Sequence, residues 1–200
     1  MAIHRVLSPA DYRRTPWKNG GGRTTEIAVE PPEAGLADFA WRVSVADIEQ
    51  DGVFSVFPGV ARTLVLLAGD GMRLTGAGAP LELHAPFEPV TFAGDAPIMC
   101  TLIGGPVRDF NLMVRRDVHR GEVIVVHERA EAMRHAGIYV CYAARGACEC
   151  LIASHPPIAL TEEHALLVEL DQADAAARSG MQVNPGSATA VALVAVIDSA

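Results

Sequence analysis

Hydrophobic and polar residues alternate with a period of about two along most of the chain. Short apolar or β-branched runs, each bounded by Gly, Pro or Asp, occur at residues 41–46, 62–67, 90–92, 99–103, 122–126, 138–142 and 188–197. Turn signals such as Gly69-Asp70-Gly71 separate them. Because successive side chains of a strand point to opposite faces, this pattern predicts an all-β protein built as a sandwich or barrel. Helical periodicity is scarce, although residues 127–135 and 172–178 could each form one or two helical turns.

A weak internal repeat divides the chain. Residues 64–74 align with residues 139–149, and residues 81–83 align with residues 158–160, which gives an offset of 75 to 77 residues. The order of short strands and Gly-Asp turns over residues 62–103 is typical of a cupin jelly roll. We therefore predict a bicupin, with two cupin-like antiparallel β-barrels or jelly rolls. The first unit, residues 1–117, would carry a ligand pocket, and the more apolar second unit, residues 118–200, would be structural.

Composition narrows the classes of function. The chain has 200 residues, is 50% hydrophobic and 20% charged, and carries a net charge of −8 with a pI near 5.3. A folded, acidic protein without clusters of Lys and Arg is not expected to bind nucleic acid or an anionic membrane. The N-terminus lacks the apolar run of a signal peptide, and the longest apolar stretch, residues 188–197, is far shorter than a spanning helix. We therefore expect a cytoplasmic protein without a membrane partner.

Cysteine and histidine usage argues against a metal site. The four cysteines, Cys100, Cys141, Cys148 and Cys150, include no CxxC pair, and we expect reduced, buried thiols rather than a disulfide or zinc framework. Alternation would place Cys148 and Cys150 on the same side of a strand. A cupin metal site needs a His-x-His pair, but no two of the seven histidines are two apart, and residues 57–62 hold none. The sequence predicts neither a metal nor another cofactor.

Polar side chains alternate with apolar ones in several predicted strands of the first half. The polar members are Glu26, Arg42, Ser44, Arg62, Asp109 and Asn111. Such faces either look at solvent, as in an antiparallel sheet with one wet side, or converge on a pocket. The equivalent stretch of the second half, residues 190–194, is apolar on both faces. That contrast favours a pocket in the first unit.

Three blocks of the first half resemble the HutD/Ves family. They are residues 17–26 (WKNGGGRTTE), residues 54–64 (FSVFPGVARTL) with Gly-Asp-Gly at 69–71, and residues 105–116 (GPVRDFNLMVRR). The resemblance implies a bicupin architecture and an association with histidine-utilisation operons. It also implies a regulatory role, with a pathway compound such as formylglutamate or urocanate as ligand and no established enzyme activity. The site-forming residues that it implies are Trp17, Asn19, Glu26, Arg62, Asp109 and Asn111, to which alternation alone adds Arg42 and Ser44.

The chemistry of these residues suits a carboxylate ligand. Arg42 and Arg62 can each bind a carboxylate through two parallel hydrogen bonds, while Ser44, Asp109 and Asn111 can hold an amide, formyl or amino group. We therefore favour a non-enzymatic small-molecule-binding protein that acts as a regulator or sensor in histidine utilisation.

Two other readings stay open. One is a metal-free cupin enzyme, an isomerase or hydrolase with Glu26 or Asp109 as general base. The other is a protein-interaction role in which the apolar second unit is a dimer face, since the long apolar last strand is compatible with a homodimer.

The glycine run at residues 20–22 is expected to form a turn. A phosphate-binding loop of the GxxxxGK[ST] type has its lysine after the glycines, whereas Lys18 precedes them and a strand-like stretch, residues 24–29, follows. We expect this turn to form the lip of the carboxylate pocket.

Overall fold

The computed structural model describes residues 3–76, 78–127, 131–133, 135–152, 155–171 and 180–200. Every regular element within these ranges is a β-strand. The chain divides into two compact units, which we call the N-terminal unit (residues 12–121 and 200) and the C-terminal unit (residues 1–11 and 122–199). Within the described ranges, no helix is long and apolar enough to cross a membrane.

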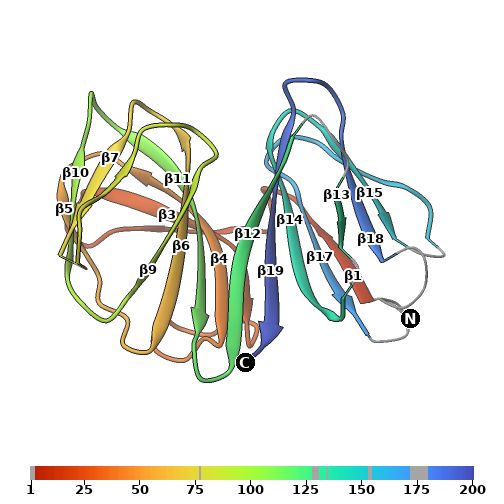
Figure 1. Cartoon of the computed structure of the whole chain (residues 1–200), viewed down its shortest axis with the longest axis horizontal. Helices are drawn as coiled ribbons and strands as arrows, with labels where there is room; N and C mark the ends of the chain where they lie inside the picture. The colour runs from red at the N-terminus through yellow and green to blue at the C-terminus, as the bar shows by residue number, and fades with distance from the viewer. Residues whose placement is uncertain (1–2, 77, 128–130, 134, 153–154, 172–179) are drawn as a thin grey trace. The chain divides into compact units, whose positions relative to one another are not determined.

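The N-terminal unit consists of two antiparallel sheets that lie face to face (Figure 1). In order across the six-stranded sheet, the strands are β2 (Arg13–Pro16), β3 (Gly22–Glu30), β4 (Trp41–Ile48), β11 (Val107–Arg115), β6 (Val60–Ala68) and β9 (Pro89–Ala93). In the four-stranded sheet, they are β5 (Gly52–Phe54), β10 (Ile98–Leu102), β7 (Met72–Thr75) and β8 (Leu81–Leu83). Alternate apolar side chains of both sheets, among them Leu64, Leu66, Met72 and Leu74, pack together as one core.

The C-terminal unit has a similar construction. In order across its five-stranded sheet, the strands are β1 (Ile3–Leu7), β17 (Ala165–Leu170), β14 (Gly137–Arg145), β19 (Val191–Ser199) and β12 (His119–His127). The four-stranded sheet contains β13 (Glu131–Met133), β18 (Met181–Pro185), β15 (Cys148–Ile152) and β16 (Ile158–Leu160). Its core is apolar and includes Tyr139, Leu166, Val194 and Val196.

The two units repeat one eight-strand topology. The order β4-β11-β6-β9 recurs as β12-β19-β14-β17, and the order β5-β10-β7-β8 recurs as β13-β18-β15-β16. Register also repeats, because Arg62 lies opposite Met113 in the first unit and Tyr139 lies opposite Val196 in the second. Eight antiparallel strands in two facing sheets form a jelly roll, so the all-β prediction of two cupin-like units is confirmed in its jelly-roll form.

Local predictions differ from the structure in two places. β1 pairs with β17, with Leu7 opposite Ala165, so the first strand of the chain belongs to the C-terminal unit, although the predicted first unit spanned residues 1–117. Within the stretch 127–135, residues 131–133 form strand β13 instead of a helical turn, because they pair with β18. The other helical prediction, residues 172–178, lies outside the described residues.

Candidate functional site

Six of the eight predicted site residues lie on the inner face of the six-stranded sheet. Glu26, Ser44 and Asn111 stand directly opposite one another on β3, β4 and β11. Arg42 and Arg62 flank Met113 in the next row, on β4 and β6. Asp109 occupies the row on the other side. Alternation grouped these side chains only within each strand, and strand pairing brings the groups together on one face of the sheet.

All six side chains are largely shielded from solvent. Relative exposure is 1% for Ser44 and Asp109 and between 6% and 8% for Arg62, Asn111 and Glu26. The side chain of Arg42 is 11% exposed. If this were the solvated face of an antiparallel sheet, the six polar side chains would be exposed to water. They are buried, so the solvent-facing alternative does not describe this face.

Glu26 is held by two guanidinium groups. Arg42 donates a hydrogen bond from Nε to Oε2 of Glu26 at 2.6 Å, and Arg13 Nη2 lies 2.9 Å from Oε1. Arg13 comes from the edge strand β2 and was not identified from the sequence. Because both carboxylate oxygens are engaged by cations, Glu26 and Arg42 satisfy each other within the sheet.

Arg62 is surrounded by aromatic rings. Its guanidinium carbon lies 4.9 Å from the ring centre of Phe54, 5.3 Å from that of Phe92 and 5.9 Å from that of Phe57. Among the described residues, Nε of Arg62 has no hydrogen-bond partner. Burial away from water is the main cause that lowers the pKa of Arg62 to about 10, while the charge of Asp109 acts in the opposite direction. Cation–π contacts offset part of the cost of burying this charge.

Asp109 and Asn111 also carry unsatisfied atoms. Oδ1 of each is buried and has no hydrogen-bond partner in the part of the chain that the structure describes. Desolvation raises the pKa of Asp109 to about 7, and the charge of Arg62 only partly counteracts it. Buried polar atoms without partners are rare in folded proteins and call for an explanation such as a ligand, a water or a catalytic role. The three unsatisfied atoms on Arg62, Asp109 and Asn111 share one face of one sheet.

Two β-bulges lie beside the candidate carboxylates. The register between β3 and β4 shifts after Glu26, and the register between β11 and β6 shifts between Arg108 and Asp109. The second bulge recurs in the C-terminal unit, between Ala143 and Arg145 of β14, so it belongs to the fold. The bulge after Glu26 lies in β3, outside the repeated strands, and re-aims the side chains of that strand.

The remaining two candidates lie in the glycine turn that precedes β3. The indole Nε1 of Trp17 donates to Oγ1 of Thr24 at 2.8 Å, and Oδ1 of Asn19 accepts the backbone N–H of Gly21 at 3.0 Å. Trp17 is half-buried and packs against the core between the sheets, whereas Asn19 is exposed. The structure therefore brings Trp17 to the edge of this core and does not bring Asn19 to the six inner residues.

Strand register equates three positions of this face with positions of the C-terminal unit, and two of those three are apolar. By register, Tyr139, Ala192 and Val194 occupy the places of Arg62, Asp109 and Asn111. The hydroxyl of Tyr139 donates to the carbonyl of His135 at 2.7 Å. One unit thus buries charged groups where the other buries a packed apolar core, as the contrast between residues 109–113 and 190–194 predicted.

A separate surface pocket of about 630 Å³ lies at one end of the six-stranded sheet. It is lined by Arg23, Asp47, Ile48, Glu49, Gln50, Ala68, Gly69, Pro106, Val107 and Arg108. None of the eight predicted site residues lines it. Arg23 Nε donates to Asp47 at 2.8 Å, so the charges of this pocket already compensate each other in part.

These features define a class: a two-unit cupin-fold protein in which one unit has a buried polar cluster and the other an apolar core. The polar cluster consists of Glu26, Arg42, Ser44, Arg62, Asp109 and Asn111. The chain belongs to the HutD family, whose sequence profile matches residues 9–184. It is 45% identical over 123 residues to a 21.2 kDa protein encoded in the hutC 3′ region of Pseudomonas putida, covering 62% of this chain and 64% of that protein. It is also 42% identical over 119 residues to protein Ves of Citrobacter koseri, covering 58% and 61%. Each match spans slightly less than two thirds of the relative.

Solved structures of similar proteins match the fold over nearly the whole chain. A conserved protein of unknown function from Pseudomonas aeruginosa PAO1 superposes with a TM-score of 0.82 at 31% identity, covering 98% of this chain and 99% of that one. HutD from Pseudomonas fluorescens SBW25 superposes with a TM-score of 0.77 at 28% identity, covering 99% and 100%. An oxalate decarboxylase from Lactobacillus farciminis, at 7% identity and a TM-score of 0.64, shares the fold alone.

Proposed function

We propose that the chain is a non-enzymatic small-molecule-binding protein that acts as a regulator or sensor in histidine utilisation. Its membership of the HutD family associates it with this pathway, and the relative from P. putida is encoded beside hutC. The ligand would be a carboxylate-bearing compound that resembles formylglutamate or urocanate. HutD from P. fluorescens was solved in a formate condition, and formate is the smallest carboxylate.

The buried guanidinium of Arg62 carries this proposal. Its Nε lacks a hydrogen-bond partner among the side chains and backbone that the structure describes, and the unsatisfied oxygens of Asp109 and Asn111 share its face of the sheet. A ligand carboxylate on Arg62 would satisfy the guanidinium, while an amide or amino N–H of the ligand would donate to the Oδ1 atoms of Asp109 and Asn111. Arg42 contributes less than its residue type predicts, because it is already paired with Glu26 at 2.6 Å.

Ligand-induced thermal stabilisation tests the proposal. The protein is heated with histidine, urocanate, formiminoglutamate, formylglutamate, glutamate or formate, and at least one carboxylate should raise the unfolding midpoint because it binds only the native state. Arg62→Met, which fills the aromatic surroundings with an apolar chain of similar length, should abolish that shift. Arg23→Met, at a guanidinium that is paired with Asp47 and 58% exposed, is the matched control and should keep the shift.

Two results would contradict the proposal. A shift that survives Arg62→Met would mean that the ligand binds elsewhere. No shift with any of the compounds would favour the protein-interaction role, with the C-terminal unit as a dimer face.

One observation favours an enzyme as the second candidate. The pKa of Asp109 is raised to about 7 by burial, which suits a general acid or base at neutral pH. Glu26, the other base considered, forms ion pairs with Arg13 and Arg42, which engage both of its carboxylate oxygens. It is therefore a poorer candidate for a general base. Incubation of the protein with each stabilising compound, followed by mass spectrometry, separates the two functions. A product that forms with the natural protein and not with Asp109→Asn would establish the enzyme.

A further inference from the structure

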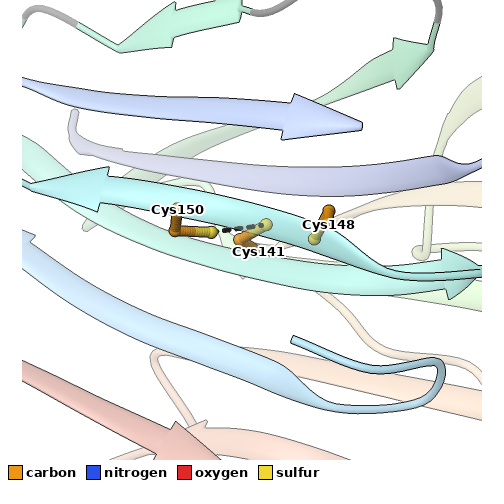
Figure 2. Close-up of side chains that lie close together, drawn as sticks. All are labelled: Cys141, Cys148 and Cys150. Carbon is orange, nitrogen blue, oxygen red and sulfur yellow. Dashed lines mark hydrogen bonds between the residues drawn. The ribbon is translucent and has the colours of Figure 1, made fainter. Parts of the chain in front are cut away.

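Three of the four cysteines meet in the core of the C-terminal unit. Cys141 belongs to β14 in the five-stranded sheet, while Cys148 and Cys150 lie two residues apart on β15 of the four-stranded sheet. The three Sγ atoms all lie within 4.8 Å of one another, and those of Cys141 and Cys150 are 3.6 Å apart. Figure 2 shows Cys148 and Cys150 on either side of Cys141. All three are free thiols and buried, as the sequence predicted, but their convergence was not predicted.

The fold itself does not require sulfur at these positions. By strand register, Cys141, Cys148 and Cys150 correspond to Leu64, Met72 and Leu74 of the N-terminal unit. At these three places of the shared topology, the N-terminal unit has long apolar side chains and the C-terminal unit has three thiols. The thiols come from both facing sheets, so they surround one point between the sheets.

We propose that Cys141, Cys148 and Cys150 together bind one thiophilic metal ion of the cuprous, Cu(I), type. Thiolate sulfur is a soft donor that favours Cu(I), zinc and iron–sulfur clusters over harder metal ions. Three sulfurs at about 2.3 Å from a central ion would lie about 4 Å from one another, a spacing close to the one found here. Each thiol that becomes a ligand releases its proton to solvent as the metal–sulfur bond forms.

The number of donors argues for Cu(I) over zinc. Structural zinc is almost always held by four protein ligands, whereas the cluster formed by the described side chains contains three. Cys148 is the first residue of β15, follows the turn at Gly146, and is 3% exposed, compared with 0% for Cys141 and Cys150. This proposal departs from the expectation of no metal, which rested on the missing histidine pattern of cupins.

Anaerobic titration of the reduced full-length protein with Cu(I), in competition with a chromophoric Cu(I) chelator, tests the proposal. We expect one tightly bound ion per chain by native mass spectrometry, thiolate-to-copper charge-transfer absorption in the ultraviolet, and a raised unfolding midpoint. Cys141→Ala and, separately, Cys148→Ala should lose the tight site. Cys100→Ala should retain it, because Cys100 is an equally buried thiol of the other unit and lies next to Met72.

Several outcomes would overturn the assignment. These are no binding, binding that is unchanged in both Cys141→Ala and Cys148→Ala, or loss of binding in Cys100→Ala alone. Tight binding of Zn²⁺ with exclusion of Cu(I) would also overturn it. Circular dichroism of each variant at the titration temperature distinguishes loss of the ligand from loss of the fold, and Cys148→Ala, at the outer end of the cluster, removes a donor with the least disturbance of the core.

Discussion

At the scale of single residues, burial of Asp109 on the inner face of the six-stranded sheet lowers the stability of the native state. Asp109 is 1% exposed, and its Oδ1 has no hydrogen-bond partner within the described ranges of the chain. Its pKa is raised to about 7 from an ordinary value of 3.8, chiefly by desolvation. An acid whose pKa is higher in the folded state holds its proton more tightly there than in the unfolded chain. Ionised Asp109 therefore destabilises the native state, as expected for a residue retained for binding or catalysis.

The sign of this effect gives a pH-dependent prediction. Asp109 should contribute most favourably below about pH 4, and that contribution should be lost as the pH rises to about 7. Asp109→Asn removes the ionisation, so its free energy of unfolding should exceed that of the natural protein by a few kcal/mol at pH 8, an upper estimate of about 4 from the pKa difference. The gain should shrink toward pH 4. Urea denaturation at several pH values measures it.

Asp117→Asn, at an exposed position, is the control for the general effect of removing a negative charge. It should leave the pH profile of the unfolding free energy nearly unchanged. If Asp109→Asn is no more stable than the natural protein at pH 8, then ionised Asp109 has a partner in solution and is not a strained group.

At the scale of elements, the three adjacent glycines of the turn before β3 meet different structural requirements. Gly20 has a φ of +72°, which most residues avoid. A Cβ on Gly21 would meet only the side chain of Asn19, at 3.4 Å or more. A Cβ on Gly22 would overlap the backbone carbonyl oxygen of Asp47 on the neighbouring strand β4. Gly22 is therefore needed for close approach of two strands, and only Gly20 is needed for its dihedral angle.

Alanine substitutions in this turn should reveal that difference. Gly22→Ala must push β3 away from β4 and should lower the free energy of unfolding by roughly 1–3 kcal/mol. Gly21→Ala, one residue earlier, is the matched control and should change it by less than about 1 kcal/mol. Chemical denaturation of both variants measures the two values. Equal losses would show that the turn, and not the contact with Asp47, sets the requirement for glycine.

The strands also explain which parts of the candidate site could be predicted from the sequence. Alternation separated the polar from the apolar side chains within each strand, since the period of two follows from strand geometry alone, and the contrast with the second half favoured their convergence on a pocket. Which charges neutralise each other depends on strand order and register across residues far apart in the chain, so the Glu26–Arg42 pair was not predictable. The rings around Arg62 escaped prediction for the same reason, although Phe54 lies in one of the motifs that identified the family.

At the scale of the whole chain, the repeat was visible because it preserves local patterns of strands and turns. The offset of about 77 residues relates β6 to β14 and β8 to β16. The first strand could not be assigned in this way, because β1 lies outside the eight-strand repeat and pairs with a strand about 160 residues later. Its place in the C-terminal unit means that the two ends of the chain contribute to one sheet, whereas the polar cluster lies wholly within residues 12–121.

This arrangement predicts a unit-specific response to mutation of the first strand. Leu7 is 4% exposed and lies opposite Ala165 on β17, whereas its neighbour Val6 is 47% exposed. Leu7→Ala should cost about 2–3 kcal/mol, and Val6→Ala, the matched control, less than about 1 kcal/mol. Hydrogen–deuterium exchange should become faster in β17 and β14 of Leu7→Ala and stay unchanged in β4 and β11, where the polar cluster lies. Faster exchange in β4 and β11 to the same extent would mean that the two units unfold as one cooperative body, and the stability of the N-terminal unit would then depend on the first strand of the chain.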